Sequence, residues 1–189
     1  MSTPRSLVIA LLVIGAAAGA ALVQYFHSSS PEIGAQQEGS DAARLDTAIN
    51  QLKGMTPSQS HSMTDVGEHW ANLWFAGGKK NWPLAQFYFD ETRSHILWTI
   101  RIRPIRQGPD GKAVDLNAIF QAIDTSALAA VKTAIEQKDA TQFAAAYKTA
   151  LESCYSCHKT SGKPYLRPMV PQSPSQSIIN FEPDAAWPQ

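Results

Sequence analysis

The sequence predicts an all-α protein, an antiparallel four-helix bundle. Apolar residues recur at helical spacing in four long segments between residues 58 and 164. We find no convincing alternation typical of β-strands after residue 42. The connections are short to moderate and contain turn residues, which favours antiparallel packing of consecutive helices. At 189 residues the chain is long enough for one domain with a core and additional tails.

The N-terminal segment predicts export. Arg5 precedes an uncharged apolar run from Leu7 to Val23, and a basic residue before such a run is typical of a signal sequence. The run is also at the short limit of about 17–25 residues that span a bilayer. Residues 1–26 are therefore either a cleaved signal peptide or a retained transmembrane anchor. Residues 27–41 are rich in Ser, Gly, Gln and Pro and predict a flexible linker.

The predicted bundle domain covers residues 42–164. A short amphipathic helix over 45–52 ends at Gly54. The next helix ends at Gly77-Gly78 and carries one apolar stripe: Met63, Val66, Gly67, Trp70, Leu73 and Trp74. Pro83 suits the first turn of a helix over about 83–103, which closes before Pro104. A loop, RQGPDGKAV, follows.

Two further helices complete the predicted bundle. Asp115 is a natural N-cap for the third. Asp139, with Gln142 three residues later, forms a capping-box pattern at the start of the fourth. Gly162 and Pro164 end that helix, and residues 165–189 form an extended, proline-rich tail. The inner face of the fourth helix carries Phe143, Tyr147, Ala150, Leu151, Cys154 and His158.

The motif Cys154-Tyr-Ser-Cys157-His158 contains the only cysteines of the chain. A disulfide between helical positions three apart would be strained. A thioredoxin-like dithiol needs a strand-to-helix context, and a structural zinc site needs four ligands. Covalent attachment of one haem c uses all three residues: both thiols bond the haem vinyl groups, and His158 becomes the proximal iron ligand. An accidental pair or a redox dithiol remains as the other interpretation.

Haem attached late in the last helix of such a bundle resembles the class II c-type cytochromes, the cytochrome c′ group. The resemblance covers about residues 58–160, and Met63-Thr-Asp-Val-Gly67-Glu-His69 is similar to the family's M-x-x-x-G-x-H pattern. It implies that Met63 is the sixth iron ligand. Met169 in the tail is the main rival, and an open sixth position is the third possibility. The long tail and the aromatic stretch after Lys79 depart from the family.

Other residues of the helices receive weaker assignments. Gly67 lets a flat porphyrin approach the helix backbone, and Trp70 is expected to pack against it. His69 lies about 240° round the helix from Met63, so both cannot bind one iron. We expect His69 to be solvent-facing or helix-capping, and His95 to be an ordinary core or surface histidine.

The predicted function is that of an exported monohaem cytochrome that carries single electrons between redox protein partners. The alternatives are a five-coordinate haem protein that binds NO or CO, and a haem subunit of a larger respiratory or oxidoreductase complex. Sixteen basic residues balance sixteen acidic ones, which argues against nucleic-acid binding. No motif of an independent enzyme appears. The expected location is the periplasm, soluble or tethered to the inner membrane, with a homodimer allowed by the aromatic second helix.

Overall fold

The computed structural model describes residues 31–175 and 178–186. The prediction for residues 1–26 lies outside the described residues. The chain divides into two compact units, and the boundary in the sequence falls between Thr56 and Pro57. Most of the described part is helical, which confirms the predicted all-α class in its coarse form.

The first unit contains helix α2, Pro31–Met55. Residues 31–41 are therefore helical, where the sequence analysis predicts a flexible linker, and α2 lies outside the unit that contains the other helices. The physical reason is local. Pro31 stands at the first helical position, where proline is favourable, and Ala, Gln and Glu residues offset the cost of Gly34 and Gly39.

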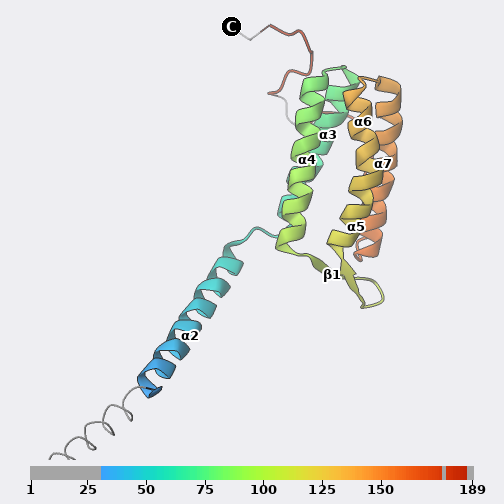
Figure 1. Ribbon diagram of the computed structural model, residues 1–189. Coiled ribbons are helices and arrows are strands. Elements are labelled where there is room, and N and C mark those ends of the chain that lie inside the picture. Colours follow the sequence, from blue (N-terminus) through green and yellow to red (C-terminus); the bar gives the residue numbers. More distant parts are fainter. Residues whose placement is uncertain (1–30, 176–177, 187–189) are drawn as a thin grey trace, which may run out of the picture. The chain divides into compact units, whose positions relative to one another are not determined.

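The second unit contains α3 (Gln59–Gly78), α4 (Trp82–Ile102), a continuous helical segment over 116–136, and α7 (Ala140–Thr160). The segment 116–136 comprises α5 (Leu116–Ile123), a π-helical turn η1 (Asp124–Leu128) and α6 (Ala129–Glu136). Figure 1 shows α3 beside α4, and α5 and α6 beside α7. These four segments surround one apolar core.

The predicted helix ends are confirmed where side-chain caps define them. Asp115 accepts hydrogen bonds from the backbone N–H groups of Asn117 and Ala118. Asp139 accepts from Thr141 and Gln142, and the Gln142 amide also donates to its carboxylate at 3.0 Å. Each carboxylate satisfies helix N–H groups that have no partner within the helix.

Two connections between helices share one geometry. Lys80 (φ 58°) follows α3 and Lys138 (φ 56°) follows α6, both in the left-handed region. The residue after each lysine donates its N–H to a helix carbonyl: Asn81 to Ala76, and Asp139 to Ala134. That residue is also the N-cap of the next helix. One left-handed residue thus reverses the chain, which makes consecutive helices antiparallel.

A short hairpin replaces the predicted loop. Strand β1 (Ile105–Gln107) pairs antiparallel with β2 (Ala113–Asp115), with Arg106 opposite Val114. Three-residue strands are too short to give an alternation signal, which is why the sequence analysis missed them. The hairpin reaches the end of α7, because a Cβ on Gly108 would lie 3.2 Å from the Thr160 carbonyl oxygen.

Segment 116–136 is, among the described residues, the one helix long and apolar enough to cross a membrane. Its side chains Phe120, Leu128 and Val131 are nevertheless buried within the second unit. The segment therefore contributes its apolar face to the core.

Helix α3 packs closely against α7. A Cβ added to Gly77 would lie 2.2 Å from Phe143, so only glycine permits this approach. Two turns earlier on α3, the indole of Trp70 stacks on the Tyr147 ring at 4.6 Å, and the Tyr147 hydroxyl donates to the Trp70 carbonyl at 2.8 Å. Going backward along α3 from Gly77 to Trp70 therefore matches going forward along α7 from Phe143 to Tyr147. The two helices run antiparallel.

The tail after α7 returns to the outer side of α3 and α4. The Ser175 N–H donates to the Asn72 side chain, and the Ser175 hydroxyl to the Glu68 carbonyl. The Asn81 amide donates to the carbonyl of Phe181, whose ring lies against Phe75 and Tyr88. Segments 165–175 and 178–186 contain no regular helix or strand, as predicted for an extended tail, but the tail is anchored by these contacts.

Candidate functional site

The predicted haem-attachment motif occupies the last turns of α7. Cys154, Cys157 and His158 are partly buried, and both cysteines are free thiols. Cys157 packs against the apolar core. Cys154 and Cys157 are three residues apart, so their thiols lie one turn apart on the same face of the helix.

The His158 ring has a fixed orientation. Its Nδ1 lies 2.9 Å from the carbonyl oxygen of Leu166. A carbonyl only accepts hydrogen bonds, so Nδ1 carries the proton and donates, and Nε2 keeps its lone pair. Gly162 (φ 74°) turns the chain after α7, and the Lys163 N–H donates to the His158 carbonyl at 2.8 Å. The turn that ends the helix therefore also brings Leu166 to His158.

Burial sets the protonation state of the thiols. It raises the pKa of Cys154 to about 11, with a smaller effect from the neighbouring Cys157. Burial likewise raises the pKa of Cys157. Both residues are protonated thiols at neutral pH, in contrast to the lowered thiol pKa of a reactive redox dithiol.

The register of α3 against α7 relates Met63 to this motif. Met63 lies seven residues before Trp70, and Cys154 lies seven residues after Tyr147. Seven residues are two turns, about 10 Å along either helix, and return to nearly the same face. Because the helices are antiparallel and Trp70 stacks on Tyr147, Met63 falls at the level of Cys154. His158, one turn beyond Cys154, shares that face of α7.

The other predicted haem contacts differ in their surroundings. Trp70 is 7% exposed and belongs to the core. Gly67 is exposed, and a Cβ added there would meet nothing within 4 Å, so protein packing alone does not require a glycine. Met169 lies in the tail with its side chain 64% exposed.

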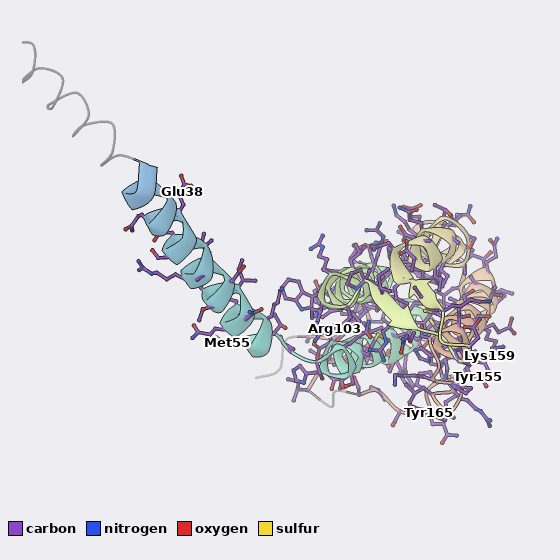
Figure 2. All side chains as sticks on the ribbon, turned by 90° about the horizontal axis from the view of Figure 1, so that it is seen from below. Glu38, Met55, Arg103, Tyr155, Lys159 and Tyr165 are labelled. Carbon is purple, nitrogen blue, oxygen red and sulfur yellow. The ribbon has the colours of Figure 1, made fainter. Side chains whose placement is uncertain are left out.

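Aromatic and apolar side chains that are partly or fully exposed lie at the end of α7 and in the segment that follows it. Lys159 lies over the Tyr155 ring at 4.8 Å, and the Tyr155 hydroxyl donates to the Pro164 carbonyl. Figure 2 shows Tyr155 and Lys159 next to each other. Tyr165 and Leu166, like Met169, are exposed large side chains in the segment that follows His158.

One histidine has a different environment from the one expected. His69, expected to be solvent-facing or helix-capping, is half-buried, and its ring lies 4.7 Å from that of His95. The carboxylate of Glu91 completes this cluster. The cluster cannot be recognised in the sequence, because only Glu91 and His95, four residues apart on one helix, are related by local spacing. The partnership with His69 requires the packing of α3 against α4.

Arg93 on α4 pairs with Asp124. Its Nε and one terminal nitrogen each donate to the Asp124 carboxylate at 2.7 Å. This two-bond contact joins α4 to the π-helical turn η1 and raises the pKa of Arg93.

Comparison of the chain with protein-family models, with curated proteins and with solved structures finds no match.

Proposed function

We propose that the protein is an exported monohaem c-type cytochrome that carries single electrons. In this proposal α3, α4, segment 116–136 and α7 form a four-helix bundle of the class II cytochrome type. One haem is attached through Cys154 and Cys157, and His158 is the proximal ligand. The observation that carries the proposal is the hydrogen bond from His158 Nδ1 to the Leu166 carbonyl. His158 belongs to a motif in which the two cysteine thiols lie one helical turn apart.

The donor set fits a covalently attached haem. The thiols are the groups that add to its vinyl substituents, and they lie on the turn that precedes the histidine. Metal-binding histidines almost always donate their second ring N–H to a carbonyl or carboxylate, which fixes the tautomer and raises the basicity of the ligand nitrogen. The Leu166 carbonyl has this role, and Nε2 of His158 is the nitrogen that would bind iron.

When bound, the haem supplies a one-electron Fe(III)/Fe(II) couple. The chain contributes orientation and exclusion of water. His158 and the two cysteines orient the group against α7, and the apolar side chains of the core restrict solvent on the inner side. A thioether from Met63 would raise the reduction potential, as Met/His ligation does in cytochromes.

Met63 is the proposed sixth ligand because the helix register brings it to the level of the motif. Gly67, one turn later on the same face, supports this assignment, since the space above it is free of protein atoms within 4 Å. Met169 remains the alternative sixth ligand. It lies three residues after Leu166, and its side chain is 64% exposed.

The exposed residues that follow His158 suggest where electrons enter and leave. Tyr165, Leu166 and Met169 lie on the segment bonded to the proximal histidine. A haem edge next to them would be accessible to a redox protein partner while the inner edge is buried. With the apolar N-terminal segment as an export signal or anchor, we place this exchange in the periplasm.

The test is expression of the full chain in a bacterium with and without the cytochrome c maturation machinery. We expect the mature protein to gain the mass of one haem only with the machinery, and Cys154→Ser with Cys157→Ser to abolish the gain. A mature, exported protein without this added mass would contradict the proposal.

Spectra of three proteins identify the sixth ligand. We expect the wild type and Met169→Leu to show the long-wavelength absorption band of oxidised Met–iron ligation, and Met63→Leu to lose it. If Met169→Leu alone loses the band, Met169 is the ligand. If the reduced wild type binds CO promptly and shows no such band, the sixth position is open and gas binding becomes the better function.

A further inference from the structure

Three potential metal-binding side chains meet where α3 packs against α4, away from the cysteine motif. His69 comes from α3, and Glu91 and His95 come from one face of α4. One nitrogen or oxygen atom from each residue lies within 4.8 Å of the others. In the described residues this is the one cluster of three or more His, Cys, Asp or Glu side chains that meets this spacing.

The hydrogen bonds of His95 leave one nitrogen available. Its Nδ1 lies 2.8 Å from the backbone carbonyl of Glu91, so Nδ1–H donates and Nε2 has a free lone pair. This is the arrangement in which a histidine binds a metal through one nitrogen while the other is held by a carbonyl. The Glu91 carboxylate lies beside the same ring, with Oε2 3.7 Å from Nδ1.

His69 contributes a polar atom that the protein leaves without a partner. Its Nδ1 is buried and makes no hydrogen bond. Most buried polar side-chain atoms in proteins are bonded, so an exception needs an explanation. The neighbouring His95 ring, at a centroid distance of 4.7 Å, does not satisfy it. A cation shared with His95 and Glu91 would complete the coordination of the cluster.

The electrostatic surroundings of His69 suit a bound cation. Burial, and next the proximity of His95, lower the pKa of His69, so this ring is uncharged at neutral pH, as a metal ligand must be. Three carboxylates, Glu91, Asp65 and Glu68, act in the opposite direction and favour positive charge at His69. The site thus combines a neutral ligand with a negative potential.

We propose that His69, Glu91 and His95 bind a divalent first-row transition-metal ion, with Zn²⁺ as the representative ion. Imidazole and carboxylate are ligands that zinc accepts at about 2.0–2.2 Å. Tetrahedral ligands at that radius lie roughly 3.4 Å apart, so the three side chains must close inward on binding. Glu91 is suited to this because its side chain is 38% exposed. Three protein ligands leave a fourth position for water or an external ligand.

The site is independent of the proposed haem. His69 lies about 240° round α3 from Met63, and its ring lies against Tyr88 and His95 of α4. The metal would connect α3 to α4, and neither Cys154 nor His158 belongs to it.

The test uses the full chain with Cys154→Ser, Cys157→Ser and His158→Ala, which removes the thiols and imidazole that could bind zinc elsewhere. Zinc content is measured after equilibrium dialysis against Zn²⁺. We expect about one zinc ion per chain, and affinity lower by about 100-fold in His69→Ala and in His95→Ala. His61→Ala is the matched control, because His61 is an exposed histidine of the same helix, and it should bind zinc unchanged.

Circular dichroism verifies that each variant is folded. Glu91→Gln keeps the size of the side chain and replaces a histidine variant in the test if that variant unfolds. We expect it to weaken zinc binding by at least about 10-fold. No zinc bound at stoichiometric level, or equal binding by His69→Ala, Glu91→Gln and His61→Ala, would overturn the proposal.

Zinc-edge X-ray absorption provides a second measurement on the wild-type chain. We expect nitrogen and oxygen neighbours at about 2.0 Å and no sulfur at about 2.3 Å. A sulfur shell would assign the zinc to the cysteines and, together with no zinc bound by the variant that lacks them, would refute the site.

Discussion

The Tyr147 hydroxyl donates a 2.8 Å hydrogen bond to the Trp70 carbonyl, while the two rings stack at 4.6 Å with an interplanar angle of 14°. Both side chains are buried, and Tyr147 is fully inaccessible to solvent. The contact therefore fixes how far α3 is shifted along α7. The position of Met63 along the helix axis, relative to Cys154, depends on this shift.

Tyr147→Phe should destabilise the protein by about 1 kcal/mol, because the change removes a buried hydrogen bond and keeps the ring. Tyr155→Phe is the matched control, since its hydroxyl bonds the Pro164 carbonyl near the surface, and we expect it to cost less than about 0.5 kcal/mol. Urea denaturation of both variants measures the difference. Equal losses would show that the Trp70 contact has no special role.

Lys80→Gly and Lys138→Gly should each stabilise the protein by about 0.5 kcal/mol. Both lysines have φ near 57°, a conformation that costs a residue with a Cβ about 1–2 kcal/mol and glycine much less. Lys79→Gly is the control: Lys79 has φ −83°, so glycine there only adds flexibility to the unfolded chain. Thermal melting should show a higher Tm for the first two variants and a lower or unchanged Tm for the third. A lower Tm for Lys138→Gly would contradict this explanation of the turn.

Gly67→Ala should have opposite effects with and without haem. In the haem-free chain the added methyl group meets no neighbour, and alanine favours the helix by up to about 1 kcal/mol. With haem bound against this position, the methyl group would obstruct the porphyrin and reduce haem content or shift the spectrum. Gly78→Ala, also open but at the end of α3, should not affect haem. A Gly67→Ala protein with normal haem content and spectrum would place the haem away from Gly67.

The haem-free chain should lose stability as the pH rises above about 9. The folded state raises the pKa of Cys154 from 9.0 to about 11, so between these values the unfolded chain releases a proton that the folded chain retains. Linkage then lowers the free energy of unfolding by up to about 1.4 kcal/mol per pH unit. Cys154→Ser should reduce this dependence in urea titrations between pH 8 and 11, and a smaller part should remain because the pKa of Cys157 is also raised. An equal slope in the variant would show that another group titrates.

The sequence alone determined the features that depend on near neighbours. The caps at Asp115 and Asp139, the start at Pro83 and the stop at Gly162 were all predicted and are all observed. Each depends on atoms within about four residues, so the local sequence contains the required information. The cysteine motif is equally local: its spacing predicts haem attachment, which stays a prediction. Residues 31–41 are the exception: their polar composition predicts a flexible linker, but it also permits the helix that is observed.

Only the tertiary structure decided which helix faces meet. It joined His69 to Glu91 and His95, gave Arg93 the partner Asp124 and brought the Leu166 carbonyl to His158. It also docked the tail on α3 and α4 through Ser175 and Phe181. The helical period shows that a face is apolar or polar, but not which other face it contacts. That choice results from side-chain packing across the whole core, as at Gly77 and Phe143, where only the absence of a Cβ permits the approach.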